Sequence, residues 1–424
     1  MDTIFALASA PGKAGVAVVR VSGPACATAL ARFGVSIPEG GRGLRRLMYG
    51  EDAVDEALLL HFASGASFTG EEVVELHLHG SPAIVARVLS ILEEIDGVRL
   101  SEPGEFTRRA FDNGRLDLAQ VEGLADLIEA ETEAQRKQAL RVLSGELGKQ
   151  ADHWRGRLTR VLALFTAGID FADEEIPDSV TDGISDDLSL VIKGLEAELA
   201  KGRAAEAIRN GFEVAIVGPP NAGKSTLLNR LAGRDAAITS DVAGTTRDVI
   251  EVRMDLGGLP VTFLDTAGLR ETQDAVEAIG VARARERAEQ ADMRIFLTDG
   301  AGLDMKPLPG DLVLQAKVDL HPEADRGVSG LTGRGVDALV SELTTTLTER
   351  VGDGGLAIRH RHRDAMRRAI GYLGEAREAL VEQGDDVIAA ELVMDSVRAL
   401  DSLVGRVDVE AILGDIFSTF CIGK

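Results

Sequence analysis

The chain has 424 residues, 45% hydrophobic, with a formal net charge of −23 at pH 7 and only two cysteines, Cys26 and Cys421. This length favours two or three domains over a single core, and the hydrophobic content argues against wholesale disorder. No apolar run approaches the ~18 residues of a membrane span, the N-terminus lacks a secretory layout, and two distant cysteines exclude a disulfide framework, so we expect a cytoplasmic protein without membrane spans.

Residues 1–115 mix short strands with turns and are predicted to form an α+β domain whose apolar strands have little helical cover of their own. The segments 15–23, 57–62 and 73–80 are predicted strands, and the last alternates apolar and polar residues. Glu75, His77 and His79 therefore share one face of the sheet. That face indicates either a metal site or simply a polar surface.

From Leu116 the apolar residues follow helical spacing, first to Ile128 and then through Leu140, Leu147 and Phe165. The acidic run at 173–175 with Pro177 marks a break, and another helix is expected over 186–209. At Phe212 the period changes again, and an α/β domain is predicted over 211–350. Helical spacing returns over 351–424, a segment short for a core of its own. We therefore predict one discontinuous helical domain, 116–210 with 351–424, into which the α/β domain is inserted.

The segment GPPNAGKST (218–226) matches a phosphate-binding loop, follows a predicted strand and precedes a helical pattern. Its glycines let backbone N–H groups turn toward phosphate oxygens, Lys224 reaches the outer phosphates, and the Ser225 hydroxyl can bind Mg²⁺. The residues expected to contact nucleotide here are Asn221, Ala222, Gly223, Lys224, Ser225 and Thr226.

Two later segments complete a nucleotide and magnesium site. The strand in VTFLDTAG (261–268) ends at Asp265, and the Gly268 N–H can reach the γ-phosphate. In GTTRD (244–248), Thr245 or Thr246 is expected to complete the magnesium shell. The order and spacing of the three segments predict a Ras-like P-loop GTPase domain, with further contacts from Asp265, Thr266, Ala267 and Gly268.

Guanine recognition is predicted after the strand at 312–315, where Ala316-Lys317-Val318-Asp319 replaces the usual Asn-Lys-x-Asp. Asp319 can accept two hydrogen bonds from guanine, and Lys317 can lie over the base. Ala316 lacks the amide that would tie the base and loops together, a loss of roughly 0.5–1.5 kcal/mol. We expect guanine selectivity with weakened affinity. The loop expected on the far side of the base is Ser329, Gly330 and Leu331.

Many GTPases place a water-orienting glutamine directly after the Asp265–Gly268 element, but this chain has Leu269 there. Another group must orient the water. The nearby polar candidates, each otherwise an ordinary surface charge, are Arg270, Glu271 and Glu277.

The net charge disfavours a nucleic-acid partner except at a local basic patch. The best candidate stretch interleaves arginines with His360 and His362. The alternative interpretation is a solvated helix face. The arginines of this stretch are Arg359, Arg361, Arg363, Arg367 and Arg368.

Beyond the inserted GTPase domain, three segments are distinctive: SFTGEEVVELHLHG (67–80), PGEFTRRAFDNGRLDLAQ (103–120) and the terminal FCIGK (420–424). With these residues the chain resembles, over essentially its whole length, the bacterial tRNA-modification GTPases usually called MnmE or TrmE. The resemblance implies a flavin- and NADH-dependent partner, called MnmG or GidA, and tRNA as substrate. Together such proteins add an aminomethyl or carboxymethylaminomethyl group to carbon 5 of the wobble uridine.

The resemblance also implies a tetrahydrofolate site in the N-terminal domain, for 5-formyltetrahydrofolate or a related derivative. Its contacts would be Arg20, Glu75, Arg115 and the terminal Lys424. A pterin then fits the polar face of the predicted strand better than a metal does. Cys421 has either a chemical role beside the flavin partner or none beyond filling space near a mobile tail.

In the resembled family, K⁺ and dimerisation of the GTPase domains supply what the missing glutamine does not. Asn221 would be the side-chain ligand of K⁺, the loop before Thr245 would add the carbonyls of Ser240 and Val242, and Glu277 would orient the attacking water. We also expect a homodimer through residues 1–115, because an uncovered apolar sheet face tends to become an interface. Lys424 would then reach the folate site only if the tail folds back or a second chain supplies it. The alternative function is a regulatory GTPase switch such as a ribosome-assembly factor, although 1–115 carries no RNA-binding signature.

Overall fold

The structure is a computed structural model that describes residues 2–170, 178–234, 237–238, 251–265, 285–299, 303, 305–321, 323–324, 326–352, 354–407, 410–418, 420 and 422–423. The chain forms two compact units, Met1–Ala125 with Asp401–Lys424, and Asp126–Leu400. The boundaries predicted at 115, 210 and 350 divide the chain more finely and remain predictions. The predicted mixture of α/β and helical parts is confirmed.

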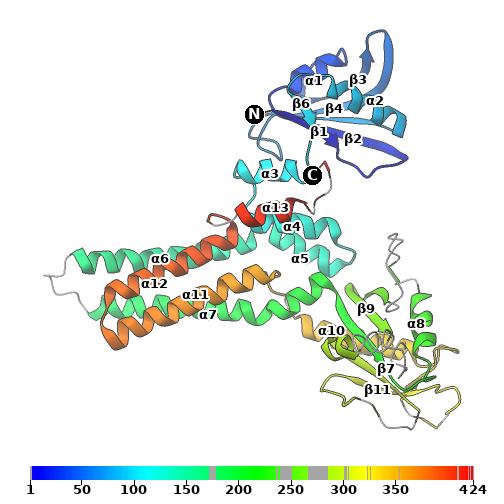
Figure 1. Cartoon of the computed structure of the whole chain (residues 1–424), viewed down its shortest axis with the longest axis vertical. Helices are drawn as coiled ribbons and strands as arrows, with labels where there is room; N and C mark the ends of the chain where they lie inside the picture. The colour runs from blue at the N-terminus through cyan, green and yellow to red at the C-terminus, as the bar shows by residue number, and fades with distance from the viewer. Residues whose placement is uncertain are drawn as a thin grey trace, which may run out of the picture. The chain divides into compact units, whose positions relative to one another are not determined.

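The first unit is built on a six-stranded sheet with the order β3-β4-β5-β2-β1-β6 (Figure 1). The β1–β6 pair is parallel and the other pairs are antiparallel. The three predicted strands are confirmed as β2, β4 and β5, although β4 begins earlier, at Asp52. The strands are β1 (Thr3–Leu7), β2 (Ala14–Ser22), β3 (Arg42–Tyr49), β4 (Asp52–Phe62), β5 (Val73–Gly80) and β6 (Val98–Leu100).

One face of this sheet is covered by α1 (Cys26–Arg32) and α2 (Pro82–Glu93). Leu30 of α1 and Val88 of α2 share a buried core with Val19, Leu59 and Leu76 of the sheet. The expectation that these strands lack helical cover is therefore wrong for this face, because both helices follow their strands directly and fold back on them.

The opposite face is more open. Leu44, Leu58 and His77 are successive cross-strand partners on β3, β4 and β5, and Val18 of β2 pairs with His77 from the other side. Leu44 is 59% exposed and Leu58 is 40% exposed. Since cross-strand partners point to the same side of a sheet, this face combines exposed leucines with the polar residues of β5.

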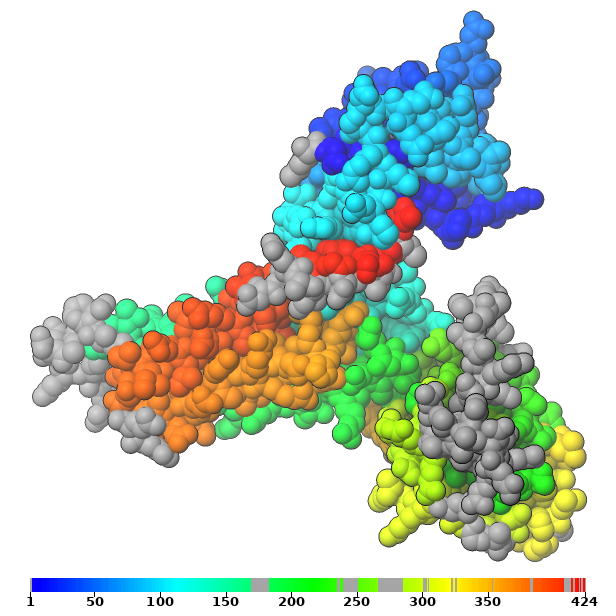
Figure 2. Space-filling view, viewed as in Figure 1, coloured from blue at the N-terminus to red at the C-terminus, as the bar shows by residue number. Residues whose placement is uncertain are grey.

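The first unit also contains α3 (Glu105–Asp112), most of α4 (Leu118–Glu129) and α13 (Glu410–Ser418). Leu118 and Val121 of α4 pack against Leu413, Phe417 and Phe420, so the C-terminal segment shares one small core with α4. Figure 2 shows the red C-terminal segment lying against the cyan segment. Helical spacing from Leu116 is thus confirmed in α4, although Ile128 is 41% exposed.

The helical part of the second unit contains α5 (Glu133–Leu143), α6 (Glu146–Asp170), α7 (Asp178–Asn210), α11 (His360–Glu378), η2 (Ala379–Gln383) and α12 (Asp386–Val404). Helix α7 contacts both α6 and α11 (Figure 1), and Ser396 Oγ of α12 donates to the Ala369 carbonyl of α11. The helix expected from residue 186 begins earlier, at Asp178. The apolar face of α6, including Phe165, is buried as predicted, whereas Leu140 of α5 is 38% exposed. The predicted break at 173–177 lies outside the described residues.

The remainder of the second unit holds a six-stranded sheet in the order β12-β11-β10-β7-β9-β8. All its pairs are parallel except β8–β9. The predicted strands at 212–218, 261–265 and 312–315 are confirmed as β7, β9 and β11. The elements are β7 (Phe212–Val217), α8 (Lys224–Ala232), β8 (Glu251–Leu256), β9 (Leu259–Asp265), β10 (Met293–Thr298), β11 (Leu312–Ala316), β12 (Gly327–Val328) and α10 (Val336–Val351). None of the helices among the described residues combines the length and apolarity that crossing a membrane requires.

Candidate functional site

The phosphate-binding loop follows β7 and leads into α8. Strand β7 lies between β9 and β10, the position where strand order reverses and where open α/β sheets bind ligands. Asn221 adopts a left-handed φ of 65° in the loop, and Ala222 is buried. Lys224 is 7% exposed, and its Nζ donates to the carbonyls of Gly218 (2.7 Å) and Pro219 (3.1 Å). The structure thus folds the lysine ammonium over the loop, with Gly223, Ser225 and Thr226 at the start of α8.

Asp265 stands at the carboxyl end of β9 and is 5% exposed. Its register partner on the neighbouring strand is Ile216 of β7, directly before the phosphate-binding loop. The parallel pairing therefore places the Asp265 carboxylate and the loop at the same edge of the sheet. Oxygen donors from Ser225 and Asp265 are the kind that Mg²⁺ prefers.

The two base-side segments follow β11 and β12 at this same edge. Lys317 has a left-handed φ of 50° in a turn closed by a hydrogen bond from the Leu320 N–H to the Lys317 carbonyl (2.8 Å). Asp319 Oδ1 is buried and has no hydrogen-bond partner within the part of the chain that the structure describes. A buried carboxylate oxygen without a hydrogen-bond partner can accept a hydrogen bond from a ligand N–H. Asp319 is predicted to accept such a bond from guanine. Ser329 is buried, and Leu331 is 74% exposed.

Ten of the predicted site residues lie outside the described residues, and their roles stay predictions. These are Ser240, Val242, Thr245, Thr246, Thr266, Ala267, Gly268, Glu277, Cys421 and Lys424. Cys26, the other cysteine, is buried, and that burial raises the pKa of its thiol to about 12.

In the first unit, Arg20 of β2 and Glu75 of β5 are cross-strand partners on the open face. Arg20 Nε and Nη2 each lie 2.9 Å from Glu75 Oε1, and His77 Nε2 lies 3.1 Å from Glu75 Oε2. The Arg20 guanidinium stacks 5.7 Å from the ring centroid of Phe106. His79 turns away to Asp55, 2.7 Å distant. No group of three His, Cys, Asp or Glu side chains that could hold a metal ion occurs among the described residues.

The C-terminal tail folds back onto this site within the same chain. Ile422 pairs with Pro103 in an isolated β-bridge, and Arg20 Nη1 donates to the Gly423 carbonyl at 3.5 Å. Gly423 has a φ of 96°, and a Cβ there would overlap the Leu7 carbonyl, so only glycine fits without strain. Lys424 lies outside the described residues, so both routes considered for it stay predictions. Arg115 has its side chain against Gly70, and no hydrogen bond or ion pair joins it to Arg20 or Glu75 among the described residues.

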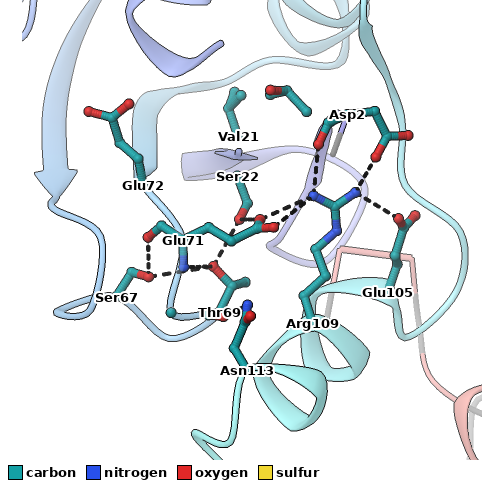
Figure 3. Close-up of polar contacts among 12 residues, drawn as sticks. Asp2, Val21, Ser22, Ser67, Thr69, Glu71, Glu72, Glu105, Arg109 and Asn113 are labelled. Carbon is teal, nitrogen blue, oxygen red and sulfur yellow. Dashed lines mark hydrogen bonds and ion pairs between the residues drawn. The ribbon is translucent and has the colours of Figure 1, made fainter. Parts of the chain in front are cut away.

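The sequence analysis missed a half-buried ionic network that joins the segments 67–80 and 103–120 (Figure 3). Arg109 Nη1 donates to both carboxylate oxygens of Glu71 (3.2 and 3.1 Å), and Nη2 donates to Asp2 Oδ1 (2.8 Å) and Glu105 Oε1 (3.0 Å). Ser22 Oγ also donates to Glu71 Oε2 (2.7 Å). The network fastens α3, and with it Phe106, to the loop before β5. The signal that could have revealed it is the spacing of Glu105 and Arg109, which lie one helical turn apart.

Hydrogen bonds set the charge states in this network. Burial alone would raise the pKa of Glu105, but hydrogen bonds from Arg99, the Glu102 N–H and Arg109 outweigh it and hold that pKa below the ordinary value. For Asp2, likewise, burial is opposed by Arg99 and Arg109, and its pKa is lowered.

The predicted basic patch is a free surface only in part: the side chains of His360 and Arg367 are 76% and 58% exposed, whereas other members are paired and buried. Arg359 Nη2 lies 2.7 Å from Asp126 Oδ1, and Arg363 Nη2 lies 2.8 Å from Glu206 Oε2. Arg363 is 8% exposed and His362 is fully buried. The first turns of α11 therefore bury basic side chains against other elements of the second unit, which argues against a nucleic-acid interface at these positions.

Comparison with known proteins gives consistent matches. The family model "MnmE helical domain" matches residues 118–421, and "GTP-binding protein TrmE N-terminus" matches residues 3–115. A protein of Cereibacter sphaeroides named "tRNA modification GTPase MnmE" is 59% identical over 429 residues, covering 100% of both chains. The protein of the same name from Ruegeria pomeroyi is 56% identical over 431 residues, again covering 100% of both. A solved structure of Aquifex aeolicus Era bound to GDP and AlF4− is 29% identical over 32% of this chain and 56% of that chain, with a TM-score of 0.24, too low to carry an argument.

Proposed function

Since the chain belongs to the MnmE family of tRNA modification GTPases and is a GTP hydrolase, we propose that it acts with a flavin-dependent MnmG partner on the wobble uridine of tRNA in the cytoplasm. The reaction adds an aminomethyl or carboxymethylaminomethyl group at carbon 5. Matches along the whole chain favour this over a ribosome-assembly switch, which would share only the GTPase domain.

The observation that carries the proposal is the meeting of Arg20, Glu75 and the C-terminal tail on the open face of the first sheet. A carboxylate and a guanidinium side by side offer both acceptors and donors to a pterin ring. Tetrahydrofolate, when bound, would supply the one-carbon unit. Arg20, Glu75, Arg115 and Lys424 would hold it, with Phe106 limiting the movement of Arg20. The fold-back of the tail supports Lys424 as a contact from the same chain.

GTP is proposed to bind at the edge formed by β7, β9, β11 and β12. Lys224 and the N-terminal turn of α8 would hold the phosphates, and Asp319 would accept hydrogen bonds from guanine. Ser225 and Thr246 would hold Mg²⁺, which neutralises phosphate charge. Asn221, with carbonyls of Ser240 and Val242 in the loop before Thr245, would hold K⁺, and Glu277 would orient water.

The open face also supports the proposed homodimer. Leu44 and Leu58 are exposed on the same face as Glu75 and His77. An exposed apolar row beside a polar site is typical of an interaction surface. A dimer through this face would place the folate pockets at or near the interface.

Wobble-nucleoside analysis tests the function. Cells lacking the protein should lose the carbon-5 substituents, as measured by mass spectrometry of nucleosides from total tRNA. The wild-type chain should restore them, and Glu75→Gln should not. Glu93→Gln, an exposed glutamate of α2 on the other side of the sheet, is the matched control and should restore them. Unchanged wobble nucleosides in the deletion strain would refute the function, and full rescue by Glu75→Gln would refute the folate site alone.

A further inference from the structure

One side chain fastens the base-side loop, Ser329-Gly330-Leu331, to helix α8. Arg230 Nε donates to the Gly330 carbonyl at 3.1 Å, and Arg230 Nη2 donates to the Leu331 carbonyl at 2.6 Å. Arg230 lies on α8, the helix that begins with Lys224 of the phosphate-binding loop. A planar guanidinium suits this task, because its donors point in fixed directions and can hold two carbonyls at once.

The loop backbone rests directly on the first turn of α8. A Cβ added at Gly330 would lie 2.5 Å from the Leu227 nitrogen and 2.6 Å from the Thr226 carbonyl carbon. Only a residue without a side chain permits this approach. Leu331 is 74% exposed, so burial of that side chain contributes little to holding the loop. The loop is therefore held by close backbone contact and by the two hydrogen bonds from Arg230.

The Arg230 contact also fixes the direction in which the backbone N–H of Leu331 points. In a trans peptide, the N–H points away from the carbonyl of the same peptide unit. Holding the Gly330 carbonyl on Arg230 turns the Leu331 N–H to the opposite side. That N–H donates to no acceptor among the described residues. The neighbouring Thr332 N–H, by contrast, donates to Ser329 Oγ at 3.1 Å.

A fixed N–H donor distinguishes the purines chemically. Guanine carries a carbonyl oxygen at carbon 6, which accepts a hydrogen bond, whereas adenine carries an amino group there, which donates. If the loop were free to move, the Leu331 N–H would not stay in position, and the discrimination between guanine and adenine would be lost. Beside that oxygen, the ring N–H and the amino group of guanine offer donors to Asp319 Oδ1, which lacks a partner among the described residues.

The residue that usually ties these segments together is missing. Ala316 is 1% exposed, and its methyl side chain cannot form a hydrogen bond to the phosphate-binding loop or to the base-side loop. A second arginine holds the segment that follows β11: Arg334 Nη1 donates to the Val318 carbonyl at 3.2 Å. Arg230 provides two side-chain hydrogen bonds that connect the phosphate-binding helix with the base-side loop.

We propose that Arg230 is the positioning residue of the guanine site and performs the bridging role of the amide absent at Ala316. Gly330 is part of the same arrangement, since it allows the loop to reach Arg230. This inference rests on the proposed guanine site and adds the group that sets its selectivity.

Binding of GDP and ADP to the full-length protein tests it. Arg230→Met should weaken GDP about tenfold while leaving ADP nearly unchanged, so the ratio of the two dissociation constants falls about tenfold. Arg230→Lys should fall in between. Arg234→Met is the matched control, because Arg234 pairs with the exposed Asp337 at 2.8 Å and has no bond to the loop. It should bind both nucleotides as the wild type does.

Rescue separates positioning from a general loss of structure. Ala316→Asn should restore most GDP affinity in the Arg230→Met background and gain less in the wild type. Equal weakening of GDP and ADP by Arg230→Met, equality with Arg234→Met, or failure of the rescue would each overturn the inference. Asp319→Asn tests the site itself, since an unchanged GDP-to-ADP ratio in that variant would remove the guanine site regardless of Arg230.

Discussion

Arg109→Met should loosen the first unit at α3. The Arg109 side chain is 12% exposed, and its partners Glu71 and Glu105 are 11% and 12% exposed. Removing one partner of a fully buried ion pair costs roughly 3–5 kcal/mol, because a charge is left uncompensated, and the Arg109 pairs are only partly buried. Glu105 keeps its ion pair with Arg99 at 2.6 Å, so the carboxylate that mainly loses its ion-pair partner is Glu71. We therefore expect the lower end of that range, about 3 kcal/mol.

Hydrogen exchange in the full-length protein measures this change where it occurs. Amides of α3 and β5 should exchange about 100-fold faster at about 3 kcal/mol of local destabilisation. Trp154, the single tryptophan, is buried in α6 of the second unit. Its emission should stay unchanged, showing that the second unit is intact.

The neighbouring arginine provides the control. Arg108 is 56% exposed and lies 4.0 Å from Asp112, so Arg108→Met should change exchange little. Glu71→Gln combined with Arg109→Met should recover part of the loss, because no unpaired charge remains. If Arg109→Met behaves like Arg108→Met, the network does not hold α3 and the reasoning is refuted.

Four further outcomes are expected. The first unit should lose stability progressively below about pH 5. The pKa of Glu105 is lowered in the folded state, and its stabilising ionised form is lost as pH falls. Hydrogen exchange of the α3 amides across a pH series, corrected for intrinsic exchange rates, checks this. GTP turnover should be higher in potassium chloride than in sodium chloride at equal ionic strength, and equal rates would contradict the role of Asn221. Glu277→Ala should bind GTP normally but hydrolyse it at least about tenfold more slowly, as single-turnover kinetics would show. Leu58→Asp should convert a dimer to a monomer in light scattering without nucleotide, whereas Leu190→Asp, an exposed leucine of α7, should not.

Local patterns were readable from the sequence because their geometry depends on neighbouring residues. The turn from β7 through the phosphate-binding loop into α8 needs only glycines, a strand pattern and a helix pattern in immediate succession. The alternation in β5 likewise predicted the common face of Glu75 and His77. The order and spacing of the motifs predicted that Asp265 and Lys224 belong to one site, and the parallel pairing of β7 with β9 places both at one sheet edge.

Tertiary structure alone decided which distant residues meet. The arginines from 359 to 368 form a basic run in sequence, yet Asp126 and Glu206, far away along the chain, neutralise two of them. In the sequence, Arg230 is an ordinary residue of a predicted helix. Its bonds to the loop after β12 appear only in the folded chain. These contacts depend on how whole elements pack, which periodicity and spacing do not encode, so the sequence by itself determined the site's local parts and the packing determined how they are held together.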